Sequence, residues 1–222
     1  MSRLDLPIRT ARLTLRDFEF SDFDGVHPYA SDPEVTRFMF YGPRTEAETR
    51  AYLDHMLRTQ RETPWTTWEL AAVLTADGRL VGACDLTLTL EHPHEADLGF
   101  IFARDAWGRG YATEAARALV RAGFEELGAT RIFATCDIAN RASAHVLEKA
   151  GLRREATLDR HKHAKDRWWT SYLYPFGAPN GSMRSSDPPS FLRAAARQAG
   201  DQRPTADGCR PADCRLILPT AD

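Results

Sequence analysis

The chain has 222 residues, of which 43% are hydrophobic, and this is enough for one medium-sized domain with a buried core. The formal net charge of −2 excludes a strongly basic overall field, so we expect neither nucleic acid nor a membrane surface as the main partner. The polar start and the lack of an 18-residue apolar stretch predict a soluble, cytoplasmic protein.

The cysteines and histidines do not predict a metal site. Cys84 and Cys136 lie in apolar runs and are expected to be reduced core residues. Cys209 and Cys214 lie in a polar tail without a second pair of ligands. Two His-x-His pairs also lack a third ligand at a suitable spacing; they span residues 92–94 and 161–163. We therefore expect no metal cofactor.

The first predicted strand, Arg12–Arg16, alternates apolar and polar residues. Helical segments follow, one behind Ser21–Asp24, which resembles a capping box, and one that begins at Asp32-Pro33. A stronger capping box at Thr45–Glu48 predicts a longer helix, whose apolar residues repeat at helical spacing.

Strands dominate the next part of the chain. The apolar runs Trp68–Leu74 and Leu80–Leu86, on either side of the turn Ala76–Gly78, predict a hairpin, and a further strand is expected at Asp97–Ala103. Four more elements are then expected: a helix over 111–127, a strand over 132–136, a helix over 141–150 and a strand over 168–174. This order predicts an α/β (α+β) fold built on a mixed sheet.

The composition changes after Pro175. Residues 177–222 are rich in Pro, Gly, Ser, Arg and Ala, which is typical of a low-complexity and mostly disordered tail. We therefore expect a folded domain over residues 1–176 and a C-terminal tail over residues 177–222.

A glycine turn joins the strand that ends at Ala103 to the next helix. Gly108 and Gly110 lack Cβ atoms and can take a positive φ, and the helix that starts at Tyr111 offers unpaired N–H groups and a positive dipole end. These features predict a cradle for a pyrophosphate. The lack of a lysine argues against a P-loop, and Thr113 at the third glycine position argues against a dinucleotide fingerprint, while a plain tight turn stays an alternative.

Six segments carry a resemblance to a known superfamily. They are Thr10–Arg16, Leu80–Gly82, Ala96–Phe100, Trp107–Ala115, Asn140–Ser143 and Leu147–Leu152. In these segments and their spacing, residues Leu4 to Pro175 resemble the GNAT superfamily of N-acetyltransferases, and within it the Rim-type branch of ribosomal-protein alanine N-acetyltransferases. The resemblance implies a GNAT-like, mostly antiparallel mixed sheet flanked by helices, with a V-shaped splay between the fourth and fifth expected strands.

The resemblance also implies where acetyl-CoA, the acetyl donor, would bind. Its pantetheine amides would pair with the strand edge near Ala103, its pyrophosphate would rest on the glycine turn, and Asn140 would reach the pantetheine arm. Arg109 either adds a charge to the phosphates or is a solvated surface arginine. The expected cofactor-binding residues are Ile101, Phe102, Ala103, Trp107, Gly108, Arg109, Gly110, Tyr111, Ala112, Asn140 and Ser143.

The resembled family transfers the acetyl group directly to the amine in a ternary complex, so no nucleophilic cysteine is expected. Many members protonate the leaving thiolate with a tyrosine at the position of Leu147, whereas the Rim-type branch implies Ser143 near the thiol sulfur. The alternative for Ser143 is a helix-start serine bonded to its own backbone. Asp97 and Glu69 are candidates for the base that takes the amine proton, and the alternative for each is a strand-edge charge.

These features predict an enzyme that acetylates a primary amine, either a protein N-terminus or a small molecule. Two other classes stay open. A non-catalytic acyl-CoA-binding or sensing module would bind the donor without transfer, and an NAD(P)-binding oxidoreductase fragment would respond to NAD(P) and not to CoA. Because dimers are common in the resembled family, a homodimer is a further expectation.

Overall fold

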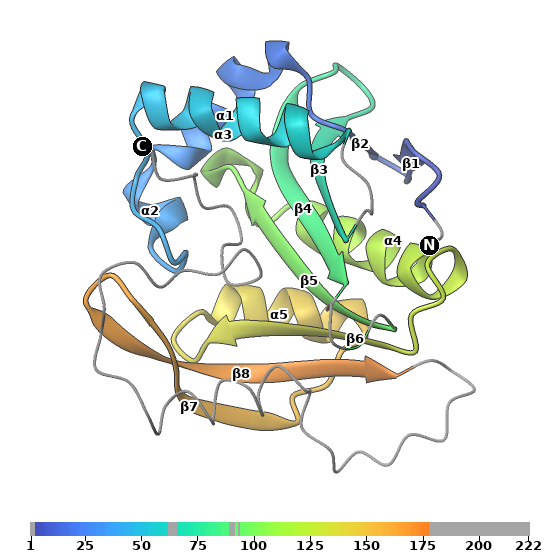
Figure 1. Ribbon diagram of the computed structural model, residues 1–222, viewed down its shortest axis with the longest axis vertical. Coiled ribbons are helices and arrows are strands. Elements are labelled where there is room, and N and C mark those ends of the chain that lie inside the picture. The colour runs from blue at the N-terminus through green and yellow to red at the C-terminus, as the bar shows by residue number, and fades with distance from the viewer. Residues whose placement is uncertain (1–2, 62–65, 89–91, 93, 178–222) are drawn as a thin grey trace.

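Eight strands form one mixed sheet in the computed structural model, which describes residues 3–61, 66–88, 92 and 94–177 (Figure 1). Across the sheet the strands follow the order β1-β2-β3-β4-β5-β6-β8-β7. Their bounds are β1 Ile8–Arg9, β2 Leu13–Arg16, β3 Thr67–Leu74, β4 Leu80–Leu88, β5 Glu95–Phe102, β6 Arg131–Asp137, β7 Ala156–Ala164 and β8 Arg167–Gly177.

Five α-helices and two short 3-10 helices connect these strands in the described ranges. The α-helices are α1 Phe23–Ala30, α2 Pro33–Thr36, α3 Glu46–Thr59, α4 Tyr111–Glu125 and α5 Arg141–Ala150. The 3-10 helices are η1 Phe20–Asp22 and η2 Arg104–Ala106. The long helices α3, α4 and α5 were all predicted, within two residues at either end.

The two halves of the sheet meet at a short parallel junction. Strands β1 to β5 are antiparallel to their neighbours, and so are β6, β8 and β7. Only β5 and β6 are parallel, and they pair only at Glu95–Arg131, Ala96–Ile132 and Asp97–Phe133. Beyond these pairs the two strands diverge, as Figure 1 shows. The mostly antiparallel sheet and its splay are therefore confirmed, and the fourth and fifth expected strands are β5 and β6.

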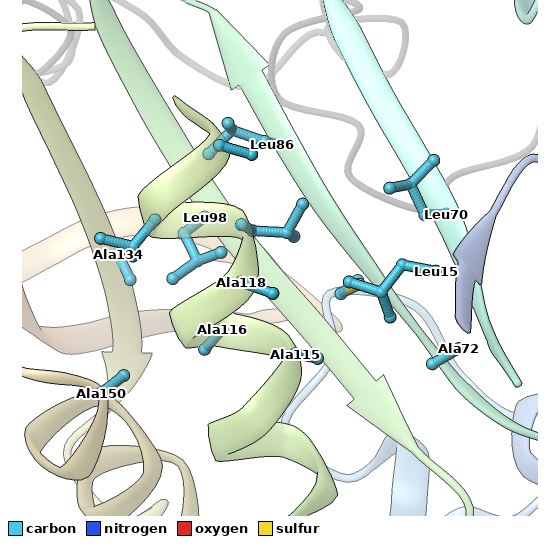
Figure 2. Close-up of a cluster of buried hydrophobic side chains, with 14 of the residues drawn as sticks. Leu15, Leu70, Ala72, Leu86, Leu98, Ala115, Ala116, Ala118, Ala134 and Ala150 are labelled. Carbon is cyan, nitrogen blue, oxygen red and sulfur yellow. The ribbon is translucent and has the colours of Figure 1, made fainter. Parts of the chain in front are cut away.

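The larger hydrophobic core lies between the sheet and helices α4 and α5. Figure 2 shows the small side chains of α4, among them Ala115 and Ala116, beside Leu98 of β5. A Cβ atom on Gly123 would lie only 2.7 Å from Cδ1 of Ile132, so the helix backbone sits close to the strands. This close packing fixes the N-terminus of α4, and with it the glycine turn, near the end of β5.

The opposite face of the sheet is covered by α1 and α3. Tyr52 and Leu53 of α3 and Val26 of α1 pack there on strand residues such as Ala71 and Ile101. The capping box predicted for α3 is confirmed, because Thr45 N–H donates to Glu48 Oε2 at 2.7 Å and Glu48 N–H donates to Thr45 Oγ1 at 3.3 Å.

The capping box predicted at Ser21–Asp24 is wrong. Glu19 N–H donates instead to Asp22 Oδ2 at 2.8 Å, and the same carboxylate forms an ion pair with Arg16 at 2.8 Å. Asp22 is therefore the acid that holds this turn, and α1 begins only after η1.

Two strands were not predicted from the sequence. β1 has only two residues, too few to show any alternation. β7 is an edge strand whose residues are mostly polar, and its register with β8 shifts between Leu158 and Lys162. Such an irregularity breaks the period-two pattern by which an edge strand is identified.

The predicted tail, residues 177–222, lies outside the described residues except for Gly177, the last residue of β8. Within the described ranges, no helix combines the length and the apolar character needed to cross a bilayer.

Candidate active site

The splay leaves one edge of β5 without a strand neighbour in the described chain beyond Asp97. Ala103 N–H donates to Val81 O at 2.9 Å, which is on the β4 side. Because backbone groups alternate along an antiparallel ladder, those of Phe100 and Phe102 point away from β4 and toward the splay. The predicted strand edge is therefore present, and an extended ligand could pair with it as another strand would.

The three residues expected to line this edge differ in the direction and the hydrogen bonding of their backbone groups. Phe102 faces the splay, but Ile101 faces β4 by the same alternation. Both backbone groups of Ala103 are engaged, because its carbonyl accepts the N–H of Ala106 at 2.9 Å. Phe100 thus replaces Ile101 and Ala103 as an outward-facing residue. Period-two alternation could identify it only once the register with β4 was known.

The glycine turn has the geometry that the sequence predicts. Gly108 and Gly110 have φ values of 72° and 81°, in the left-handed region. The N–H groups from Gly108 to Thr113 donate to no other backbone carbonyl in the described chain, whereas Trp107 N–H donates to Arg104 O at 3.2 Å. A row of unpaired N–H groups at the positive end of α4 can bind an anion such as a pyrophosphate.

Two side chains fasten this turn to the preceding structure. Trp107 Nε1 donates to Phe102 O at 2.8 Å, which ties the turn to the end of β5. Arg109 Nε donates to Asp105 O at 3.1 Å, and its side chain is exposed. A contact between Arg109 and the phosphates of a ligand stays a prediction.

A clasp from the N-terminal segment holds the turn from the other side, and the sequence did not predict it. Arg12 Nη1 donates to Arg109 O at 2.9 Å, and Arg12 Nη2 pairs with Glu114 Oε2 at 2.7 Å. The guanidinium also lies 4.7 Å from the ring centre of Tyr111, and Thr10 Oγ1 donates to Glu114 Oε1 at 2.7 Å. We call these contacts the Arg12 clasp. Glu114, which also complements the helix dipole from the first turn of α4, is its anchor.

Asn140 and Ser143 lie on the other wall of the splay, at the start of α5. Asn140 Oδ1 accepts the N–H of Ser143 at 3.1 Å and so caps the helix. Its amide nitrogen takes no part in this bond and can donate to a ligand. The Ser143 hydroxyl forms no hydrogen bond with another described residue, so the alternative of a bond to its own backbone is not observed.

The thiols and Leu147 belong to the hydrophobic core. Cys84 and Cys136 are free and buried. Burial raises the pKa of Cys136 to about 12 and raises that of Cys84 further, so both are protonated and weakly nucleophilic at neutral pH. Leu147, at the position where many superfamily members carry a tyrosine, is 1% exposed within the core.

The two candidate bases, Glu69 on β3 and Asp97 on β5, share the face of the sheet that α1 and α3 cover. Alternation along the strands places them on the same side as Ala71 and Ile101, which pack against those helices. A third carboxylate, Asp85 of β4, lies between them and pairs directly with Glu69 in the ladder. Asp85 was not predicted as a site residue, because it lies in an apolar run that is typical of a core strand.

Glu69 is set to titrate near neutral pH. Desolvation and the charge of Asp85 raise its pKa to about 8, against the opposing effects of Tyr52 and Arg44. The Tyr52 hydroxyl, from α3, donates to Glu69 Oε1. A carboxyl group with such a pKa is suited to act as a general base.

No group of three or more His, Cys, Asp or Glu side chains that could hold a metal occurs among the described residues. His163, one member of the His-x-His pairs, packs instead against Trp168, with ring centres 5.2 Å apart.

Comparisons with known proteins agree with this geometry. Residues 12–153, more than half of the chain, match the family model described as "Acetyltransferase (GNAT) domain". The uncharacterized N-acetyltransferase YnaD of Bacillus subtilis (strain 168) is 32% identical over 168 residues, covering 75% of this chain and 94% of YnaD. The FsC-acetyl coenzyme A-N(2)-transacetylase of Aspergillus fumigatus is 32% identical over 154 residues, covering 65% of this chain and 64% of that protein.

A solved structure agrees as well. The crystal structure of a GNAT-family acetyltransferase from Bacillus anthracis matches with a TM-score of 0.69 and 32% identity, over 77% of this chain and 97% of that chain. The splayed strands, the glycine turn and the helix behind it all lie within the matched family region. The chain therefore belongs to the GNAT family of acetyl-CoA-dependent acetyltransferases.

Proposed function

We propose that this protein transfers the acetyl group of acetyl-CoA to a primary amine by direct attack within a ternary complex. The splay between β5 and β6 carries the proposal. It places a strand edge with outward backbone groups beside a turn with unpaired N–H groups. The edge suits the pantetheine amides and the turn suits the pyrophosphate, so one CoA molecule would occupy both.

This orientation directs the acetyl group to the point where β5 and β6 begin to diverge, which we call the apex. A pantetheine arm that runs from the glycine turn along β5 leads toward Asp97, the last β5 residue paired with β6. Phe100 N–H would there donate to the carbonyl oxygen as negative charge develops on it. On the opposite wall, Asn140 would donate to the pantetheine arm and Ser143 to the leaving thiolate.

The acceptor would approach from the face that α1 and α3 cover. The candidate bases Glu69 and Asp97 lie on that face, whereas α4 and α5 pack on the other. Glu69 has a pKa suited to proton transfer, and Asp97 lies on β5 itself, at the apex. A protein N-terminus and a small amine both satisfy this chemistry. Membership of the Rim-type branch, which the Asn140–Ser143 segment favours, and a homodimer stay predictions.

Thermal unfolding with acetyl-CoA, CoA and NAD at equal concentration tests the donor site. A ligand that binds only the folded state, at 100-fold over its Kd, adds about 2.7 kcal/mol to the free energy of unfolding. Gly110→Ala should weaken the acetyl-CoA shift, because it places a side chain at a φ of 81° in the turn. Gly42→Ala is the matched control, because nothing lies within 4 Å of the Cβ atom that it adds.

The acceptor is then sought by release of the CoA thiol, with spermidine, an aminoglycoside and a peptide with a free N-terminal alanine as probes. A shift with acetyl-CoA but not NAD, together with acetylation of one of these amines, supports the proposal. A shift without transfer to any amine would indicate a binding module, and the absence of a shift with acetyl-CoA would end the proposal.

A further inference from the structure

Asp85 lies in a row of three residues that crosses the central strands. The ladders pair Glu69 of β3 with Asp85 of β4, and Asp85 with Gly99 of β5. Gly99 is two residues beyond Asp97, so this row ends at the apex of the splay. Asp85 is only 6% exposed, while Glu69 and Gly99 keep partial contact with solvent.

The missing side chain of Gly99 makes room for the Asp85 carboxylate. A Cβ atom built on Gly99 would lie 2.1 Å from Asp85 Oδ1 and 2.9 Å from its Cγ, distances that real Cβ contacts do not reach. The carboxylate therefore leans across β5, in the volume that a side chain at position 99 would occupy. This position places the carboxylate against Gly99, two residues beyond the apex.

Polar side chains from α1, from α3 and from the loop before α3 lie near the Glu69 carboxyl group. The Tyr52 hydroxyl donates to Glu69 Oε1, and the Arg44 guanidinium, 4.2 Å from the Tyr52 ring centre, places a positive charge near Glu69. The Tyr29 hydroxyl is buried and has no hydrogen-bond partner among the described residues. Its pKa is raised by burial and by the nearby Tyr41 and Glu69. A buried, unsatisfied hydroxyl near the Glu69 carboxyl group requires an explanation, and a polar ligand group that binds there would supply it.

We propose that Asp85 meets the acceptor amine at the apex and takes its proton, and that Glu69 is a positioning residue behind it. This inference rests on the proposed function and deepens it. Two carboxyl groups that face each other across a ladder, one of them buried, favour a state with one proton between them, so the pair carries a single negative charge. That charge suits a ligand that enters as an ammonium ion.

The protons balance without a further reactant. The ammonium ion gives one proton to Asp85, and the neutral nitrogen then forms a bond to the carbonyl carbon. As the carbon–sulfur bond breaks, a second proton moves from nitrogen to the thiolate, with Ser143 beside it. The third stays on the amide product, and Asp85 releases its proton to solvent.

The test compares Asp85→Ala, Gly99→Ala and the double variant with the wild type, with spermidine as the first amine and Gly42→Ala as control. Removing a general base costs about 100-fold or more, so D85A should lower kcat by that factor. Gly99→Ala should also lower kcat, because its Cβ displaces the carboxylate. The double variant should be no worse than D85A, since no carboxylate is left to displace.

Two further measurements separate a chemical role from a structural one. The Kd for acetyl-CoA, from calorimetry, should stay within twofold in D85A because backbone groups hold the donor. The kcat/KM deficit of D85A should shrink as the pH rises toward the amine's pKa of about 10, because the amine then loses its proton to water. Glu69→Gln should change the pH profile less than D85A, as a positioning role requires.

The outcomes separate the two proposals. A wild type that binds no acetyl-CoA, or acetylates no amine, overturns the proposed function and this inference with it. A wild type that acetylates an amine while D85A keeps its kcat overturns the inference alone. The role given to Asp85 is also contradicted if the kcat/KM deficit of D85A does not change with pH. It is contradicted as well if the kcat of the double variant is below that of D85A by the full factor that Gly99→Ala causes alone.

Discussion

Glu69 is held where its charged form is disfavoured. It stands on a central strand, with Asp85 opposite and the Tyr52 hydroxyl donating to it. Desolvation and the Asp85 charge raise its pKa to about 8, so the folded state binds the Glu69 proton more tightly than the unfolded state does. The stability from this proton is complete below the unfolded pKa and is lost as the pH rises toward 8.

Glu69→Gln should therefore change the pH dependence of stability. Relative to this variant, the wild type should lose up to about 1.4 kcal/mol in the free energy of unfolding per pH unit, between about pH 5 and pH 8. Urea unfolding across that range measures the difference. Glu46→Gln, at an exposed site on α3, should show no such slope. A wild-type curve parallel to that of E69Q would mean that Glu69 is charged in the folded state.

Arg12 is the other residue whose role can be isolated. It touches the Arg109 carbonyl, Glu114 and the Tyr111 ring, all within the turn or the first turn of α4. Arg12→Ala should raise the KM for acetyl-CoA about tenfold, through a looser cradle, while kcat at saturation changes by less than about twofold. Initial rates over a range of acetyl-CoA concentrations measure both constants.

Arg50→Ala is the control for that experiment, because Arg50 forms an exposed ion pair with Glu46 at 3.8 Å on α3. It should leave both constants unchanged. If R12A lowered kcat and left KM alone, the Arg12 clasp would not act through the donor site.

At the scale of elements, one side chain at the start of α5 has a structural role and a proposed ligand-binding role. Asn140 uses its oxygen to cap the helix through Ser143 N–H, which leaves its amide nitrogen available to the splay. The small residues of α4 also serve both packing and the site. They bring the helix close to the sheet and so place its N-terminus at the end of β5.

Two substitutions at Asn140 should separate its roles. Asn140→Asp keeps a cap acceptor but loses the donor, so stability should hold while acetyl-CoA affinity falls about fivefold. Asn140→Ala loses both, and should also lower the free energy of unfolding by about 1 kcal/mol. Calorimetric Kd values and urea midpoints check both effects. Equal affinity of N140D and the wild type would show that the amide nitrogen does not bind the donor.

At the scale of the whole molecule, the sheet consists of two wings. The first holds β1 to β5 and the second holds β6, β8 and β7, and only three residue pairs join them within the sheet. A second connection crosses the open end of the splay, where Lys165 Nζ, from the β7–β8 turn, donates to Thr36 O at 2.9 Å. The Phe40 and Trp169 rings pack nearby, with centres 5.4 Å apart.

Lys165→Ala should weaken that second connection. We expect a loss of about 1 kcal/mol in the free energy of unfolding and faster hydrogen exchange in the segment around Thr36. Hydrogen-exchange mass spectrometry measures the local effect. Lys149→Ala, in the last turn of α5, is the control and should leave exchange near Thr36 unchanged. Unchanged exchange in K165A would mean that this bond does not restrain the wings.

The sequence predicted the parts of the fold that follow a local rule. Alternation in Arg12–Arg16 and short apolar runs elsewhere identified six strands, and the positive φ of Gly108 and Gly110 followed from their place between a strand and a helix. Contacts between distant segments had no such signal. The Arg12 clasp joins residues about a hundred positions apart, and the role proposed for Asp85 depends on its register with Glu69 and Gly99. Register depends on which strands are neighbours, and no local pattern contains that information.

The splay also has a consequence for the handling of the purified protein. The backbone groups of β5 and β6 that face each other across the splay form two strand edges inside a sheet that would otherwise be continuous. An exposed strand edge is a template for pairing with another chain. A bound coenzyme would occupy these edges as an inserted strand does, so it should act as a protectant against self-association. Light scattering during mild heating should therefore rise later with CoA present than without it.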